Sequence, residues 1–166
     1  MGIHTIRVHA DPVLRQPTAA VTELDGALAR LVEDMIETMY AAPGVGLAAN
    51  QVGVQKRVFV WDIGDGPGVA VNPVLAEHRG EWTYDEGCLS VPGLFWPIVR
   101  PKQVHLTAVD LHGRELSIDA DEMLARVFLH EVDHLDGKLL LERLDPEQRK
   151  DARRRLRDRV LDLDAR

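Results

Sequence analysis

The stretch that decides the fold of this 166-residue chain is His130-Glu131-Val132-Asp133-His134, which reads H-E-x-x-H inside a segment with helical spacing of apolar residues. On a helix, residues four positions apart lie on the same face, so both imidazoles can bind one metal ion. Glu131 lies beside that ion, where its carboxylate can accept a proton from water. The stretch therefore predicts a hydrolytic metalloenzyme, and the third metal ligand decides which kind.

The segment around this motif has the signals of a strand pair followed by a helix. Residues 103–110 alternate apolar and polar side chains, and residues 115–118 are expected to form the partner strand. Asp119 is expected to cap the following helix, Glu122 to complete a capping box, and Gly137 to end the helix. The inner stripe of this helix comprises Met123, Val127, His130 and His134. The motif is thus expected to face the protein interior.

The rest of the chain predicts another helix and further strands. Apolar residues recur with helical spacing over residues 25–41, and Pro43-Gly44 stops that helix. Residues 57–63 and 69–75 are rich in strand-forming side chains. The order of helix, strands and helix predicts an α+β fold. We expect a compact single domain over residues 1–166, with antiparallel or mixed β-sheets around a central metal-binding helix.

Composition and charge describe an ordinary soluble globular protein. Hydrophobic residues make up 45% of the chain, and no run approaches the roughly 20 apolar residues of a membrane span. A formal net charge of −7 argues against DNA binding, because phosphates would repel the protein. The single cysteine excludes an intramolecular disulfide, and no charged-then-apolar leader opens the sequence. We therefore expect a cytoplasmic protein that binds neither DNA nor membranes.

Two arrangements for the third metal ligand fit the chain poorly. A metzincin-like site needs a histidine where this chain has Leu140. A gluzincin-like site would take a downstream glutamate, but Glu147 follows His134 closely and belongs to a basic segment. Neither arrangement explains the motif.

Cys88 is the remaining candidate for the third ligand. A thiolate is a strong ligand for zinc or iron, and a Cys/His/His set leaves one position open for water. Gly87 and Pro92 predict an irregular segment around it rather than a packed strand, which weakens the alternative of a small buried side chain. A cysteine nucleophile would leave the His-Glu-His arrangement without a purpose, so metal ligation is preferred.

Three motifs in order resemble those of the peptide deformylase family. They are residues 44–51 (G-V-G-L-A-A-N-Q), residues 86–90 (E-G-C-L-S) and residues 130–134 (H-E-V-D-H). The resemblance covers nearly the whole chain, and the three motifs together are far more specific than H-E-x-x-H alone. It implies an enzyme that hydrolyses the N-formyl group from the initiator methionine of new polypeptides and releases formate. A related protein that binds peptide N-termini without turnover is the alternative, and the base beside the metal disfavours it.

The resemblance also implies a role for each matching residue. The implied metal ligands are Cys88, His130 and His134. Glu131 is the implied general acid/base, while the Gln51 amide and the Leu89 backbone N–H are implied to stabilise the oxyanion. Glu86 and Arg100 match a structural ion pair that holds the cysteine segment. The resemblance favours Fe²⁺ as the single divalent ion, and Zn²⁺, Ni²⁺ and Co²⁺ are alternatives.

The substrate contacts follow from the same motifs. The backbone at Gly44 and Gly46 could approach an extended formyl-methionyl peptide and pair with it like a strand. The candidates for the pocket that receives the methionine side chain are Val45, Tyr84, Met123 and Val127, although core packing would explain them equally well. Three departures from the family bear on the pocket: Leu129 stands where many members have glutamine, residues 94–96 (L-F-W) form an unusually apolar stretch, and Arg126 lies one helical turn before His130.

The last part of the chain is basic. Residues 147–160 are expected to form a helix rich in arginine, and in an acidic protein this block is a candidate docking surface. For an enzyme that acts on nascent peptides, the ribosome would be the partner. A solvated helix with internal ion pairs is the preferred interpretation, because charge runs usually face water.

Overall fold

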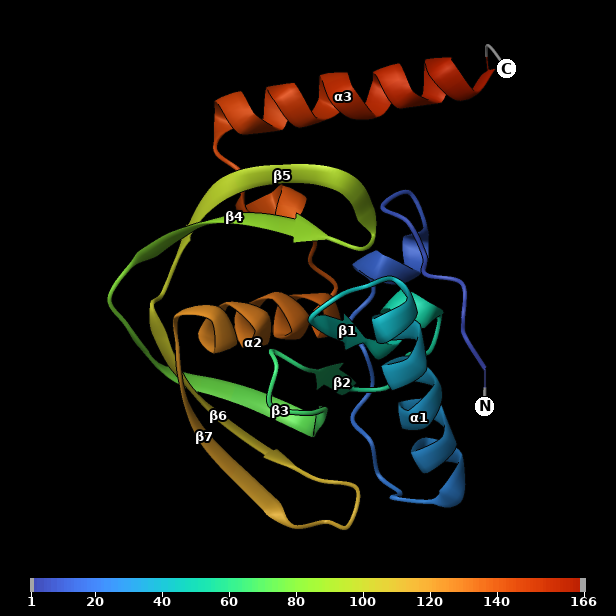
Figure 1. Cartoon of the computed structure of the whole chain (residues 1–166), viewed down its shortest axis with the longest axis vertical. Helices are drawn as coiled ribbons and strands as arrows, with labels where there is room; N and C mark the ends of the chain where they lie inside the picture. The colour runs from blue at the N-terminus through green and yellow to red at the C-terminus, as the bar shows by residue number, and fades with distance from the viewer. Residues whose placement is uncertain (1, 165–166) are drawn as a thin grey trace.

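The computed structural model describes residues 2–164 and places the motif helix between two β-sheets (Figure 1). This helix, α2 (Glu122–Leu135), is covered on one side by a five-stranded sheet of order β1-β2-β3-β6-β7. The strands of that sheet are β1 (Gly46–Ala48), β2 (Val58–Trp61), β3 (Gly68–Arg79), β6 (Gln103–Val109) and β7 (Glu115–Asp121). A hairpin of β4 (Trp82–Cys88) and β5 (Val91–Arg100) covers the other side. All strand pairs in both sheets are antiparallel, so the expected α+β fold around a central helix is confirmed.

Helix α1 (Gly26–Ala41) matches the predicted first helix. Asp25 caps it, accepting a hydrogen bond from the Leu28 amide at 2.9 Å. The buried stripe of α1 comprises Leu28, Val32, Met35 and Met39. It packs on the apolar side chains of β1 and β2 in a core of its own. The strands predicted at 57–63, 69–75, 103–110 and 115–118 are present as β2, β3, β6 and β7.

The predicted capping box at the start of α2 is wrong. Asp119 lies within β7, opposite His105, and the strand continues to Asp121, which precedes the helix without a side-chain cap. The Glu122 amide donates instead to the Lys102 carbonyl at 2.8 Å. The β6–β7 hydrogen-bond ladder therefore displaces the local capping pattern. The predicted end is confirmed: Gly137 follows the helix with φ of 76°, where glycine is favoured.

The expectation of an irregular segment around Cys88 rather than a strand is only partly confirmed, because Cys88 lies in β4 but the β4–β5 register shifts between Gly87 and Cys88. Cys88 is the last residue of β4, and side chains of β5 alternate between buried and exposed along the strand. A two-stranded sheet has only edge strands, so the prolines of β5 remove no interior ladder hydrogen bond. The buried side of the hairpin packs on η3 (Leu140–Arg143) and on the first turns of α3 (Pro146–Asp164).

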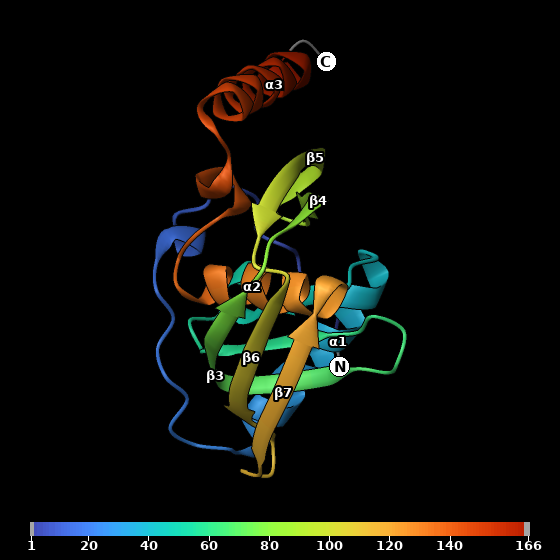
Figure 2. The same ribbon diagram turned by 90° about the vertical axis from the view of Figure 1, so that its left-hand side faces the viewer.

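Helix α3 is the predicted basic helix, and it runs along β5 at one end of the molecule, where Gln148, Asp151 and Arg159 are hydrogen-bonded to Pro97, Trp96 and Pro92 (Figures 1 and 2). Short 3₁₀ segments, η1 (Pro12–Arg15) and η2 (Ala49–Val52), complete the described elements. Residues 1, 165 and 166, which the expected domain includes, lie outside the described part. Between residues 2 and 164, no helix combines the length and apolar character needed to cross a membrane.

Candidate active site

The three predicted metal ligands converge from two elements. His130 and His134 project from one face of α2, and Cys88 reaches them from the end of β4. The two Nε2 atoms lie 3.1 Å apart, and Cys88 Sγ lies 3.2 Å from His134 Nε2. The ligand atoms of all three residues lie within 4.8 Å of one another.

This arrangement fits one divalent ion. Metal–nitrogen distances of about 2.0–2.1 Å and a metal–sulfur distance of about 2.3 Å imply donor separations of about 3.3–3.6 Å in a tetrahedral site. The observed separations of 3.1 and 3.2 Å are close to those values. Burial holds the pKa of His134 well below its usual range. A neutral imidazole is the form that binds a metal.

Glu86 orients one of the two histidines. Its Oε2 lies 3.4 Å from His130 Nδ1, so a proton on Nδ1 leaves Nε2 free to face Cys88. Arg100 makes two hydrogen bonds to the Glu86 carboxylate, at 2.7 and 2.9 Å, and Arg126 makes a third at 3.2 Å. Burial opposes ionisation of Glu86, but His130 and Arg100 lower its pKa far below the usual range. The structure thus contains the Glu86–Arg100 ion pair, and Glu86 also contacts His130, a predicted metal ligand.

Asp133 extends this network away from the site. It accepts from Arg100 at 2.7 Å and from Arg143 of η3 at 2.7 and 2.9 Å. Although burial raises the pKa of Asp133, the hydrogen bond from Arg143 and the charge of Arg100 lower it overall. Asp133 therefore supports the site from the side of α2 that faces away from the metal ligands.

Glu131 lies beside the ligand set with a free oxygen. Its Oε2 is buried and has no hydrogen-bond partner among the described residues. Burial raises the pKa of Glu131 to about 7. An ideal Cβ at Gly46 would lie 2.5 Å from Glu131 Oε1, so glycine is needed there to make room for the carboxylate. A carboxyl group of this kind is suited to take up and release a proton near neutral pH.

The Gln51 side chain is held in one orientation. Its Oε1 accepts from the Ala48 amide at 2.9 Å, so Nε2 points the other way. Nε2 donates to Ser90 Oγ at 3.1 Å and lies 3.9 Å from Cys88 Sγ. Leu89 lies in the turn between Cys88 and Ser90. The structure therefore brings both predicted oxyanion residues next to the predicted third ligand.

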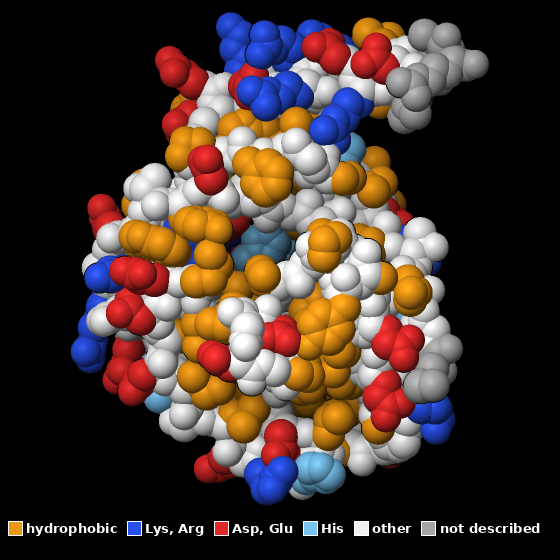
Figure 3. Space-filling model, in the orientation of Figure 1, with side chains coloured by type: hydrophobic (Ala, Val, Ile, Leu, Met, Phe, Trp, Pro, Cys, Tyr) orange, Lys and Arg blue, Asp and Glu red, His pale blue; other side chains and the backbone are white. Residues whose placement is uncertain are grey.

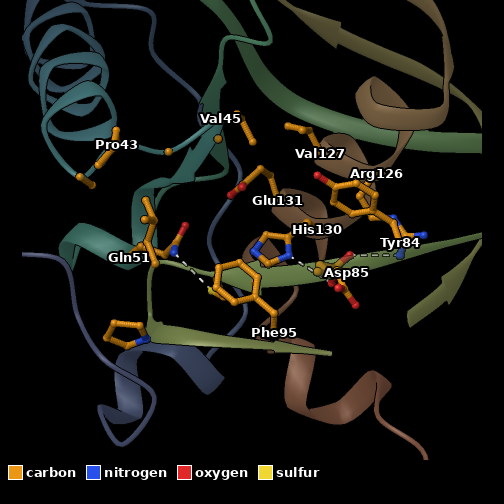
Figure 4. A pocket seen from close by; sticks show the side chains of 18 of the residues that line it. Pro43, Val45, Gln51, Tyr84, Asp85, Phe95, Arg126, Val127, His130 and Glu131 are labelled. Atoms are coloured by element: carbon orange, nitrogen blue, oxygen red, sulfur yellow. Dashed lines mark hydrogen bonds and ion pairs between the residues drawn. The ribbon is translucent and has the colours of Figure 1, made fainter. Parts of the chain in front are cut away.

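A cleft of about 530 Å³ opens over these groups. Figure 3 shows a hollow with histidine side chains at its base and hydrophobic side chains around its mouth. Figure 4 shows Glu131, His130 and Gln51 turned toward the cleft, with Val45 and Val127 on one side and Phe95 on the other. The residues proposed from the sequence for substrate binding all line it: Gly44, Val45, Gly46, Tyr84, Met123 and Val127.

The comparisons with known proteins agree with this geometry. Residues 3–150 match the model of the family described as Polypeptide deformylase. The chain belongs to this family. Its enzymes remove the N-formyl group from nascent polypeptides, so the chain is a hydrolase of the deformylase class.

Individual deformylases align over most of their length. The peptide deformylase of Acidothermus cellulolyticus is 48% identical over 158 residues, which cover 95% of this chain and 88% of that protein. The enzyme of Clostridium botulinum is 48% identical over 143 residues, covering 86% and 97%. A crystal structure of a peptide deformylase from Legionella pneumophila superposes with a TM-score of 0.91 at 41% identity, covering 99% of this chain and 98% of the other. A deformylase from Ehrlichia chaffeensis in complex with actinonin gives a TM-score of 0.90 at 36% identity, covering 96% and 98%.

The sequence interpretation named two parts of the deformylase site only as departures from the family. Phe95 lines the cleft and is 60% exposed, because β5 points it away from the hairpin's buried side. The alternation along β5 was the available signal. Arg126, expected only to point near the pocket, is buried and lies over the rings of Trp82 and Tyr84 at 5.6 and 6.0 Å. It forms part of the cleft wall and also contacts Glu86.

Proposed function

We propose that this chain hydrolyses the formyl amide of formyl-methionyl nascent peptides with one divalent metal ion held by Cys88, His130 and His134. The observation that carries the proposal is the convergence of three donor atoms at the base of the cleft, with the Glu131 carboxylate beside them. When bound, such an ion supplies Lewis-acid activation of water at neutral pH.

The chain's own residues would handle the proton and the developing charge. Glu131 is buried and has one unpaired oxygen, which supports its role as the base that takes a proton from water and returns it to the leaving amine. Gln51 Nε2 is aimed by its own Oε1 contact and would donate to the oxyanion together with the Leu89 N–H. Each such donor is worth about 3 kcal/mol of barrier lowering when well placed.

The cleft walls support a substrate with an apolar first side chain. Val45, Tyr84, Met123 and Val127 would contact the methionine side chain. Gly44 lines the cleft next to β1, where the peptide backbone would approach, and its lack of a side chain makes room for Leu89, whose Cδ1 would lie 2.7 Å from a Cβ there. Gly46 also lines the cleft and makes room for Glu131.

Formate release tests the reaction. The protein is purified anaerobically, loaded in turn with Fe²⁺, Ni²⁺, Co²⁺ or Zn²⁺, and assayed with formyl-Met-Ala-Ser. We expect metal-dependent formate production, with Fe²⁺ as the native ion and loss of activity in air. Absence of formate from every metal-loaded sample would refute the enzyme proposal.

Metal content tests the ligand set separately. Cys88→Ser and His130→Ala should each retain less metal after dialysis, whereas the exposed control His112→Ala should keep the wild-type content. Wild-type metal content in Cys88→Ser would remove that residue from the ligand set.

We further propose that the enzyme works in the cytoplasm and that α3 contacts the ribosome. The support for the ribosome contact is the basic character of α3 and its position at one end of the molecule, with most of its arginines exposed (Figure 1). Deletion of residues 149–166 should reduce co-sedimentation with ribosomes. The control is formate release from formyl-Met-Ala-Ser by the same variant. Unchanged co-sedimentation would contradict the contact.

A further inference from the structure

A second cavity, of about 520 Å³, lies on the opposite side of α2 from the substrate cleft. The cleft is lined by Met123, Val127 and His130 of that helix, whereas this back cavity is lined by Leu129, Val132 and Asp136. These two sets lie on opposite faces at helical spacing. The other walls come from β3, the end of β5 and the segment after α2; Figure 2 shows β3 and β5 on either side of α2.

The floor of the back cavity is apolar. It is formed by Leu75, Leu129 and Val132, of which Leu129 is one of the departures from the family noted in the sequence. Val74 and Val99 extend this surface outward, where they are 58% and 56% exposed. Exposed branched apolar side chains around a concave floor suit an aliphatic group.

The rim of the back cavity has an excess of positive charge. Four cationic side chains line the cavity, namely Arg57, Lys138, Arg143 and the buried Arg100, against two carboxylates, and Arg100 also pairs with Glu86. Both carboxylates already have partners: Asp136 is 2.8 Å from Arg57, and Asp133 binds Arg100 and Arg143. Among residues 2–164, Lys138 makes no side-chain hydrogen bond or ion pair and is exposed. A ligand with an anionic head would complement this rim.

We propose that the back cavity is an effector site for an amphipathic carboxylate, with the aliphatic tail on the apolar floor and the carboxylate between Lys138 and Arg143. Arg143 is 41% exposed at its side chain, so it is accessible from the cavity. A planar guanidinium can bind a second carboxylate in the same way that it binds Asp133.

Arg143 connects this cavity to the metal ligands. It holds Asp133 at 2.7 Å, Asp133 holds Arg100 at 2.7 Å, and Arg100 holds Glu86 at 2.7 Å. Glu86 in turn lies 3.4 Å from His130 Nδ1. A ligand that draws Arg143 away from Asp133 removes the outermost contact of this series of ion pairs. This loss should lower kcat without changing KM. This effect on the reaction rests on the proposed function, whereas binding to the cavity does not.

Octanoate is the probe, with octanol and acetate as matched controls that lack the charge or the tail. Isothermal titration of the metal-loaded protein should detect octanoate and neither control. Lys138→Glu, which opposes the carboxylate, and Val74→Asp, which places a charge beside the aliphatic tail, should each weaken octanoate binding about ten-fold or more. Phe95→Ala, in the substrate cleft, should leave this binding unchanged. Saturating octanoate should lower kcat about ten-fold. Loss of a residue that orients a metal-binding histidine has an effect of about this size.

Several results would overturn the proposal. They are absence of binding at millimolar octanoate, weakening by Phe95→Ala but not by Lys138→Glu, and an unchanged kcat at saturation. Competition with formyl-Met-Ala-Ser would place octanoate in the substrate cleft and would also overturn it. Failure of the proposed reaction would appear differently, as absence of formate before any octanoate is added.

Discussion

Helices α2 and α3 both carry many charged residues, but they place them in opposite environments. From Ala125 to Leu135, every residue of α2 is buried, including Arg126, Glu131 and Asp133. In α3 the arginines lie mostly in solvent, and Ala152 is its one buried residue among those described (Figure 1). The same residue types therefore have different consequences in the two helices.

The difference follows from the cost of burying charge. A buried ion without partners is strongly destabilising, so Arg126 and Asp133 of α2 are held by side chains from β4, β5 and η3. On α3, Asp151 pairs with Arg154 and Arg155 of the same helix. Such exposed pairs contribute about 0.3–0.5 kcal/mol each. The charged side chains of α2 thus form part of the candidate site, whereas those of α3 lie mainly on the protein surface.

The largest expected difference between the two helices is in activity. Glu131→Gln should lower kcat by about 10²–10⁴-fold, because the proposed base is removed while the shape of the side chain is kept. Glu147→Gln, the same change on exposed α3, should leave kcat unchanged. Formate release measures both. Full activity in Glu131→Gln would show that another group carries the proton.

A second difference is expected in stability. Arg100→Met leaves Glu86 and Asp133 with fewer partners in the interior and should lower the free energy of unfolding by about 3–5 kcal/mol. Arg153→Met on α3 should change it by less than about 0.5 kcal/mol. Urea unfolding followed by circular dichroism compares the two. Equal effects would mean that the buried network is not structurally important.

A smaller effect is expected where α2 meets β1. In Gly46→Ala, the added Cβ would lie 2.5 Å from Glu131 Oε1, so the carboxylate must move. We expect a loss of about 1–3 kcal/mol in stability and a lower kcat with little change in KM. Gly2→Ala is the control, because nothing lies within 4 Å of its Cβ position. A wild-type kcat in Gly46→Ala would show that the Glu131 carboxylate does not need the space that glycine leaves at position 46.

The smallest effect is expected at the base of α3. Hydrogen bonds from Arg154 and from Trp96, whose Nε1 lies 3.2 Å away, lower the pKa of Asp151. The carboxylate therefore stabilises the folded state above its usual pKa, and this contribution is lost as pH falls through the lowered value. Asp151→Asn should be slightly less stable than wild type at about pH 6, and the difference should shrink at about pH 3. Urea midpoints at the two pH values measure it, and a constant difference would contradict the assignment.

The elements that could be predicted from sequence are those with a clear local period. The apolar stripe of α1 and the alternation in β6 depend on residues close in sequence, so both could be identified. The β4–β5 hairpin was missed because Gly87 and Pro92 indicate irregular backbone, and only its packing on η3 and α3 reveals the strands. The Asp119–Glu122 capping box failed for a related reason, since pairing of β7 with β6 overrides a local signal.

The candidate site, like the fold, could be predicted from the sequence only in part. The motifs identified the residue types, and the cleft brings all six proposed substrate residues together. Apart from the Glu86–Arg100 ion pair that the resemblance implied, the contacts that hold the site were not predictable, because Arg100 and Asp133 are 33 positions apart and Arg126 and Glu86 are 40 apart. Arg143 lies outside every motif that the sequence suggested.

By itself, the sequence determined that two imidazoles and a carboxylate share one region of a helix, because helical periodicity is set by neighbouring residues. It also determined the family through three short motifs. Only the tertiary structure decided that Cys88 Sγ lies 3.2 Å from His134 Nε2, that Gly46 makes room for Glu131, and that a second cavity lies behind α2. These features depend on packing between distant segments, where the cost of burying charge selects which side chains meet.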